Sequence, residues 1–143
     1  MPRSHFEIRS MHLLDFARDV RAIHLQMLEA SLSHRETRGS CLFACILLTE
    51  TLQQFMPHST SIIRGGDGKG DGGFQDRAGA WHGHYWVEVE LNAQRYVVDI
   101  TADQFGEEDI VVLPVSQATR YAPGNQNETN AGVASEMARV QKR

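Results

Sequence analysis

Three residues that lie far apart along the chain have side chains that could together form a covalent catalytic site. Cys41 follows a Gly-Ser pair at the head of an apolar run, His84 lies in GHYWVEV, and Asp99 lies in RYVVDIT. A thiolate can attack a carbonyl carbon, an imidazole can take up and return the proton, and a carboxylate can hold the imidazole in one tautomer. A buried acid is costly without a partner, which favours a functional role for Asp99. The three residues therefore predict nucleophilic acyl transfer.

The element that carries Cys41 is predicted to be a helix over residues 41–55, with Ser40 as its N-cap. Its first half, CLFACILL, is apolar all round, which is typical of a helix enclosed by the fold. At a helix N-terminus the unpaired N–H groups and the helix dipole stabilise a thiolate and can bind an oxyanion. Cys45, one turn further on, is predicted to be a core residue, and its i,i+4 spacing from Cys41 argues against a disulfide.

The segments after this helix are predicted to be strands. Four of them alternate or are rich in β-branched residues: 59–66, 80–91, 94–101 and 109–117. A turn at residues 92–94 makes a hairpin in which His84 and Asp99 lie nearly opposite each other. The alternation assigns Val87 to the core face and His84 to the other face. Pro114 indicates that the last strand is at an edge or near its end.

Helices come before strands, which predicts an α+β fold with the apolar helix packed on an antiparallel sheet. A first helix over residues 10–33 has Arg21 on its polar side. Its apolar residues recur at helical spacing: Leu13, Phe16, Ala17, Val20, Ile23, Met27 and Leu28. The segment 65–79 is rich in Gly and Asp and is predicted to be a mobile surface loop, suited to a lid. We expect one domain over 1–120 and a C-terminal tail, partly helical, over 121–143.

The composition excludes several classes of protein. The chain has 143 residues, 41% of them hydrophobic, which is enough for one core. A net charge of -4 with scattered basic residues argues against nucleic-acid binding. No stretch approaches the roughly 18 to 20 apolar residues of a membrane span, and no signal segment is visible. The sequence therefore predicts a cytoplasmic protein without a membrane segment, and no cofactor is expected.

The three motifs resemble those of the transglutaminase-like superfamily, within the papain-like cysteine hydrolase fold. That family's pattern is Gly-x-Cys at a helix start, then His-x-Trp-Val-Glu, then a strand that ends in Asp-x-Thr. Here the pattern falls on Cys41, His84 and Asp99, within residues 38–106. DITADQFG is similar to bacterial members, although Ile100 stands where the family commonly has Pro. The resemblance implies a small cysteine hydrolase, protease or transferase with these three residues as its catalytic triad.

That family's chemistry would be hydrolysis, deamidation or transamidation of a protein or peptide substrate through a thioester. No counterpart of the glutamine that assists the oxyanion in papain-like proteases is evident upstream of Cys41. The oxyanion would then rest on backbone N–H groups at the helix start, and the residues expected around the site are Leu42, Trp81 and His82.

Two other functions are also consistent with the sequence. The protein could be a non-catalytic binding or assembly module that keeps the fold and docks a protein partner through the first helix or the tail. It could also be a zinc protein, because His82 and His84 have the His-x-His spacing of zinc ligands, with Asp99 or Cys41 as the third ligand. The expected Cys41–His84–Asp99 triad itself requires no metal.

Overall fold

The computed structural model describes residues 5–32 and 40–141. Two helices come first, α1 (His5–Leu32) and α2 (Cys41–Phe55), and α3 (Gln126–Gln141) comes last. The elements between α2 and α3 are β1 (Thr60–Gly66), β2 (Gly73–Gln75), β3 (Trp81–His82), β4 (His84–Leu91), β5 (Gln94–Asp99), η1 (Ala102–Phe105), β6 (Val111–Pro114), η2 (Val115–Gln117) and β7 (Tyr121–Ala122). The predicted α+β class, with helices before antiparallel strands, is confirmed.

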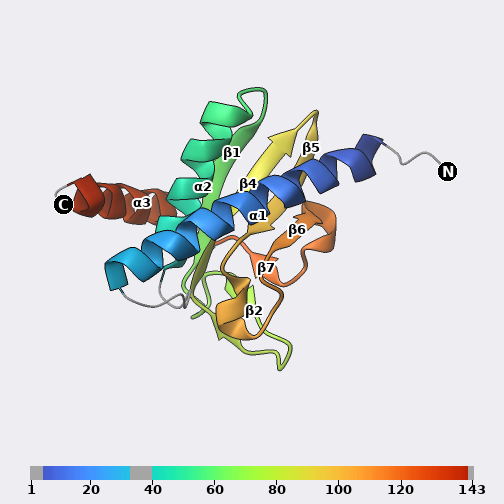
Figure 1. Cartoon of the computed structure of the whole chain (residues 1–143). Helices are drawn as coiled ribbons and strands as arrows, with labels where there is room; N and C mark the ends of the chain where they lie inside the picture. The colour runs from blue at the N-terminus through green and yellow to red at the C-terminus, as the bar shows by residue number, and fades with distance from the viewer. Residues whose placement is uncertain (1–4, 33–39, 142–143) are drawn as a thin grey trace.

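The main sheet is antiparallel, with strand order β1-β4-β5-β6, and a small second sheet has the order β3-β2-β7. Figure 1 shows α1 running across α2 and the sheet. β4 and β5 form the predicted hairpin, but Leu91 pairs with Gln94, so the turn has two residues. Those residues, Asn92 and Ala93, have left-handed φ values of 52° and 66°, which suit the twist of a two-residue hairpin. β6 is an edge strand that ends at Pro114, as predicted.

The first residues of β4 are buried on both faces, although the alternation assigned only one face to the core, while Glu90 near its end is exposed. On the helix side Val87 and Val89 pack in the main core with Leu48 and Leu52 of α2. Fully burying each of these leucines contributes about 2 kcal/mol. On the other face Trp86 packs in a second cluster that includes residues from the segment after β6. The prediction assumed that one face of the sheet is exposed to solvent, whereas the chain after β6 folds back over that face.

The buried face of α1 differs from the predicted one. Its buried side chains form one stripe at helical spacing: Leu13, Ala17, Val20, Arg21, His24 and Leu28. Ile23 and Met27, which were assigned to the apolar face, are 47% and 39% exposed. Arg21, which was assigned to the polar side, is buried. Counting only apolar residues displaced the predicted face, because two polar residues belong to the buried stripe.

The glycine-rich segment 65–79, predicted as a surface loop, contains the end of β1, a hydrogen-bonded turn and the strand β2. The Asp67 carboxylate accepts the N–H groups of Lys69 (2.7 Å) and Asp71 (3.1 Å). The turn packs closely on β3: a Cβ on Gly73, whose φ is +121°, would lie 2.3 Å from the carbonyl oxygen of His82. Glycine is needed here because two backbones meet with no room for a side chain.

The segment predicted as a tail forms β7 and the 16-residue helix α3. Val133 and Met137 of α3 pack against the main core, and the Gln126 amide donates a hydrogen bond to the carbonyl oxygen of Ile63 (2.8 Å). The helix is therefore longer than expected and is part of the packed structure. No helix in the described part of the chain is long and apolar enough to cross a membrane.

Candidate active site

His84 and Asp99 lie side by side at adjacent strand ends. His84 begins β4 and Asp99 ends β5, and the register pairs Val87 with Val98, so the two residues are diagonal neighbours rather than directly opposite. The Nε2 atom of His84 lies 2.7 Å from Oδ2 of Asp99, and both side chains are buried. The structure thus brings together two of the three residues expected to act as a triad.

Asp99 accepts further hydrogen bonds that hold it as a carboxylate. Its Oδ1 accepts the backbone N–H of Thr101 (2.9 Å) and the Thr101 hydroxyl (3.3 Å). Its Oδ2 accepts the Tyr121 hydroxyl (2.8 Å) in addition to His84. Burial raises the pKa of Asp99, but the charge and hydrogen bond of His84 and the other donors outweigh it, so the net shift is downward. Asp99 is therefore a buried, ionised partner for the ring.

The charge state of His84 follows from the same balance. Burial lowers the pKa of His84, whereas the charge of Asp99 and its hydrogen bond raise it, and the Cys41 side chain raises it further, giving a pKa of about 10. Nδ1 is buried and makes no hydrogen bond of ordinary geometry within the described residues. The Cys41 side chain therefore acts on the charge state of the ring. Because Asp99 takes Nε2, Nδ1 is the nitrogen left for Cys41.

Cys41 is the first residue of α2, as the sequence predicts, and it is half-buried. The first bond of the helix is donated by Ala44 to the carbonyl oxygen of Ser40 (3.0 Å). The N–H groups of Cys41, Leu42 and Phe43 therefore precede the intrahelical ladder. Cys45 is buried, and burial raises the pKa of its thiol well above the ordinary value. The two cysteines thus differ sharply, and only Cys41 lies where donors for an oxyanion are available.

The residues expected around the site have different surroundings. The Leu42 side chain is half-buried and packs against the main core, so only its backbone can serve an oxyanion. Trp81 is 42% exposed, and among the described residues it has no recorded contact with the proposed triad. His82 binds Asp76 (Nε2–Oδ2 2.7 Å) and stacks on Phe105, with ring centroids 4.7 Å apart.

Aromatic rings surround His84. The ring centroids of Phe105, Phe74, Trp86 and Tyr121 lie 5.0, 5.9, 6.2 and 6.5 Å from that of His84. These rings exclude water from the His84–Asp99 pair, which strengthens the attraction between their charges. Tyr121 has a second role because its hydroxyl binds Asp99. Sequence reasoning missed Tyr121, and no local motif marks it.

Helix α1 supports both ends of the site. The His24 Nε2 atom bonds to the Ser40 hydroxyl (3.0 Å), directly before Cys41. Arg21 donates to the carbonyl oxygen of Ile100 (2.7 Å), directly after Asp99, and to the Asp103 carboxylate (3.0 and 3.2 Å). The Ser40 side chain makes no cap bond to the helix, so its hydroxyl serves this contact instead of the predicted capping role. Arg21 and His24 were also missed.

A signal for these two residues was present in the sequence. His24 is three residues after Arg21, and both fall on the stripe that runs through Ala17 and Val20. A charged or polar residue on a buried helix face needs a hydrogen-bond or ion-pair partner, so such residues indicate a specific polar contact with another segment. Burial and then the Arg21 charge lower the pKa of His24 to about 4, so this ring is neutral near pH 7.

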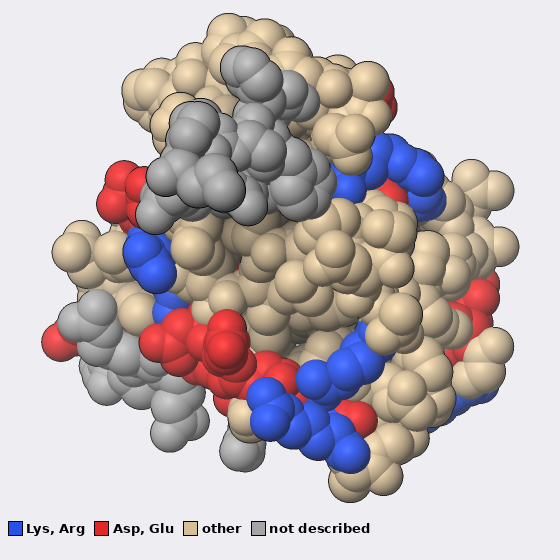
Figure 2. Space-filling view, turned by 90° about the vertical axis from the view of Figure 1, so that its right-hand side faces the viewer, with Lys and Arg blue, Asp and Glu red and all other residues tan. Residues whose placement is uncertain are grey.

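The metal alternative has no matching arrangement. His82 and His84 each bind a different carboxylate, Asp76 and Asp99. The described residues contain no group of three or more His, Cys, Asp or Glu side chains that could hold a metal ion. On the face shown in Figure 2, acidic and basic side chains lie next to each other, so that face offers no uniformly positive surface.

No protein-family model, curated protein or solved structure matches this chain.

Proposed function

We propose that this protein is a cysteine-dependent acyl-transfer enzyme of the transglutaminase-like type, with a papain-like fold. The observation that carries the proposal is a buried His84–Asp99 pair, 2.7 Å apart, whose remaining ring nitrogen is left for a cysteine at a helix N-terminus. The order of the sequence motifs and the packing of α2 on an antiparallel sheet support the same assignment. The proposed substrate is the side-chain or backbone amide of a protein or peptide.

The proposed reaction begins with the Cys41 thiolate and the His84 imidazolium. Sulfur attacks the amide carbon, the C–S bond forms, and the carbonyl electrons move to oxygen, where N–H groups at the start of α2 bind the oxyanion. The oxyanion collapses, the C–N bond breaks, and His84 gives its proton to the leaving amine. Water or an amine then attacks the thioester, His84 removes its proton, and the Cys41 thiolate leaves. Asp99 keeps the ring oriented throughout.

The proposal is tested by the reactivity of Cys41 toward iodoacetamide at pH 6. An ordinary thiol has little thiolate at this pH, so a Cys41 paired with an imidazolium is expected to react at least about tenfold faster than glutathione. Fragment-ion mass spectrometry of the peptide that carries both cysteines separates alkylation at Cys41 from alkylation at Cys45. His84→Gln serves as the matched variant and should bring Cys41 down to the glutathione rate.

Two results would overturn the proposal. If Cys41 reacts no faster than glutathione, and His84→Gln changes nothing, the site has no activated thiol and the docking-module hypothesis becomes the better one. If a chelator abolishes the reactivity pattern and metal analysis finds zinc in the purified protein, the zinc hypothesis replaces it.

A further inference from the structure

A pocket of about 370 Å³ lies next to β6 and adjoins the proposed triad without containing it. Its lining includes Phe74, whose ring lies 5.9 Å from that of His84, and Tyr121, whose hydroxyl binds Asp99. Neither Cys41, His84 nor Asp99 is among the lining residues. The volume is in the range of pockets that hold small organic molecules.

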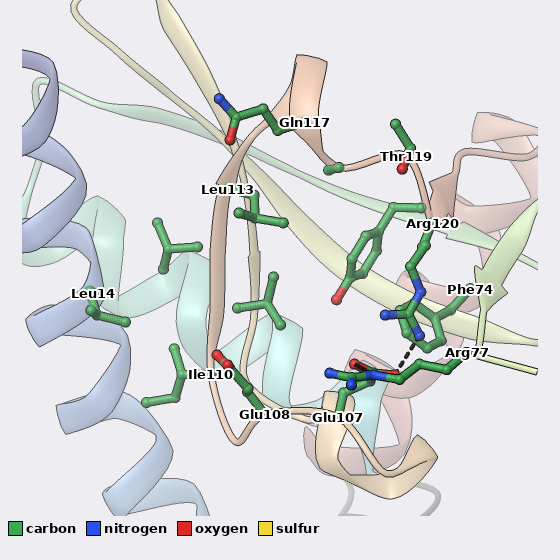
Figure 3. Close-up of a pocket in the computed structure, with 14 residues that line it drawn as sticks. Leu14, Phe74, Arg77, Glu107, Glu108, Ile110, Leu113, Gln117, Thr119 and Arg120 are labelled. Carbon is green, nitrogen blue, oxygen red and sulfur yellow. Dashed lines mark hydrogen bonds and ion pairs between the residues drawn. The ribbon is translucent and has the colours of Figure 1, made fainter.

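The pocket has two chemically different walls. Figure 3 shows Leu14, Ile110 and Leu113 on one side and Arg77 and Arg120 on the other. The first wall comes from α1 and from the segment around β6, and the residues named from it are half-buried aliphatic side chains. A molecule that fills the pocket therefore meets an apolar surface on one side and guanidinium groups on the other.

The polar wall is an ion-pair cluster of Arg77, Glu107 and Arg120 in which some guanidinium N–H groups remain available to a ligand. Glu107, whose side chain is only 7% exposed, bonds to Arg120 and accepts from Nε of Arg77 (3.3 Å to each oxygen). Nε of Arg120 donates to the carbonyl oxygen of Gln75 (2.8 Å), and its guanidinium lies 4.9 Å from the centre of the Phe74 ring. Within the described residues, the Nη groups of Arg77 and the Nη1 group of Arg120 have no recorded acceptor.

The charge of this cluster favours an anion. Two arginines and one glutamate leave one formal positive charge on the wall. The hydrogen bond from Arg120 lowers the pKa of Glu107, so this carboxyl stays ionised. Glu108 also lines the pocket, and in Figure 3 it lies on the side of Ile110. An anionic group would therefore be directed toward Arg77 and Arg120 and away from Glu108.

We propose that this pocket binds a small amphipathic carboxylate, with the carboxylate on Arg77 and Arg120 and an apolar body against Leu14, Ile110 and Leu113. A planar carboxylate matches the fork of a guanidinium, and a single negative charge matches the net charge of the cluster. The second part of the proposal rests on the proposed function. A ligand against the Tyr121 ring would alter the hydroxyl contact to Asp99 and thereby change the reactivity of Cys41.

Binding is tested by isothermal titration calorimetry with octanoate, below its micelle concentration, with octan-1-ol and octylamine as probes of equal length. Octanoate is expected to bind more tightly than either. Arg77→Gln should weaken octanoate binding about tenfold, which is the usual effect of losing a charge-assisted hydrogen bond. Glu108→Gln should leave the affinity equal or higher. Arg95→Gln, at an exposed arginine outside this pocket, is the matched control and should have no effect.

Equal binding of octanoate and octan-1-ol, absence of octanoate binding at millimolar concentration, or equal effects of Arg77→Gln and Arg95→Gln would overturn the binding site. The coupling is tested separately by the rate of Cys41 alkylation with and without saturating octanoate. We expect at least a twofold change in the wild-type protein and a smaller change in Tyr121→Phe. Octanoate binding without any change in rate would remove the coupling and leave the binding site. A Cys41 no more reactive than glutathione would instead refute the proposed function.

Discussion

Two histidines that lie two residues apart in this chain each bond to a carboxylate, and the two hydrogen-bond distances are equal. His82 binds Asp76 and His84 binds Asp99, each with 2.7 Å between Nε2 and Oδ2. The side chains of the first pair are 37% and 21% exposed, whereas those of the second are 0% and 1% exposed. Distance alone therefore does not distinguish a buried pair from a surface contact.

The surroundings of the two carboxylates make the difference. Asp76 accepts the backbone N–H groups of Ala78 and Ala80 (2.9 Å each), so it closes a turn, and its hydrogen bond with His82 is the main cause of its lowered pKa. Asp99 sits where water cannot screen its charge, and its field helps to raise the pKa of His84 to about 10. The buried pair thus strongly raises the proton affinity of the His84 ring.

The largest expected effect comes from Asp99→Asn. Without this charge the His84 imidazolium loses its main stabilisation, and Cys41 should lose its ion-pair partner. At pH 6 an ordinary thiol with a pKa of about 8.5 is about 0.3% thiolate, so the rate of Cys41 alkylation should fall by up to about 300-fold. The rate is measured by quenching the alkylation reaction at successive times and determining the alkylated fraction of Cys41 by mass spectrometry.

Asp76→Asn is the matched control for this substitution, because it removes the carboxylate of the exposed pair. It should change the alkylation rate by less than about twofold, since exposed ion pairs are weak. Circular dichroism of both variants checks that the fold is retained. Similar losses in the two variants would show that burial is not what separates the pairs.

His24 sharpens the comparison because it is a buried histidine whose ring, among the described residues, is bonded to a hydroxyl, that of Ser40, and to no carboxylate. Its pKa is about 4 in the folded protein and about 6.5 when unfolded, so the unfolded chain binds the extra proton as the pH falls between these values. The free energy of unfolding should therefore fall by up to about 3 kcal/mol from pH 6.5 to pH 4. Urea unfolding at several pH values measures this slope.

His24→Gln keeps a polar group for Ser40 and does not titrate, so the slope between pH 6.5 and pH 4 should flatten in this variant. His58→Gln is the control, since His58 is exposed. Asp99 contributes little between these pH values, because its pKa is about 3.9 in the unfolded chain and lower in the folded protein. An unchanged slope in His24→Gln would mean that another group carries the acid sensitivity.

The sequence predicted the elements of the site better than their supports. The helix from Cys41 to Phe55 and the hairpin were predictable because apolar patterning, turn residues and strand alternation act locally. The hairpin was predicted, but its register was not: the observed two-residue turn pairs Leu91 with Gln94, and this shift of one residue brings Asp99 to the same face as His84. Tyr121 could not be predicted, because its contact with Asp99 depends on how the chain after β6 folds back over the sheet. Contacts between segments that lie far apart in the chain produce no periodic pattern of residues in the sequence.

Tyr121→Phe should have an intermediate effect on the buried pair. The change removes one of the hydrogen bonds to Asp99 and keeps the ring that packs 5.2 Å from Trp86. Loss of one hydrogen bond to a charged group costs about 1.5 kcal/mol at the low end of the usual range, so the alkylation rate of Cys41 should fall about tenfold. Thr129→Val is the control for a hydroxyl lost away from the pair. Thr129 is a buried residue in the first turn of α3, and its hydroxyl donates to the carbonyl oxygen of Asn125. A rate unchanged in Tyr121→Phe would show that Thr101 and His84 suffice to hold Asp99.

The smallest effect is expected at His82. Phe105 contacts both histidines, stacked on His82 at 4.7 Å and edge-on to His84 at 5.0 Å, so an apolar ring packs against both imidazoles. His82→Gln keeps a polar group for Asp76 and should change the Cys41 alkylation rate by less than about twofold. Phe105→Leu in the same assay should have the larger effect, because it thins the apolar cover of His84 and admits water to the pair. A loss of tenfold or more in His82→Gln, with Phe105→Leu near the wild-type rate, would place His82 in the site and make the exposed pair, too, part of the chemistry.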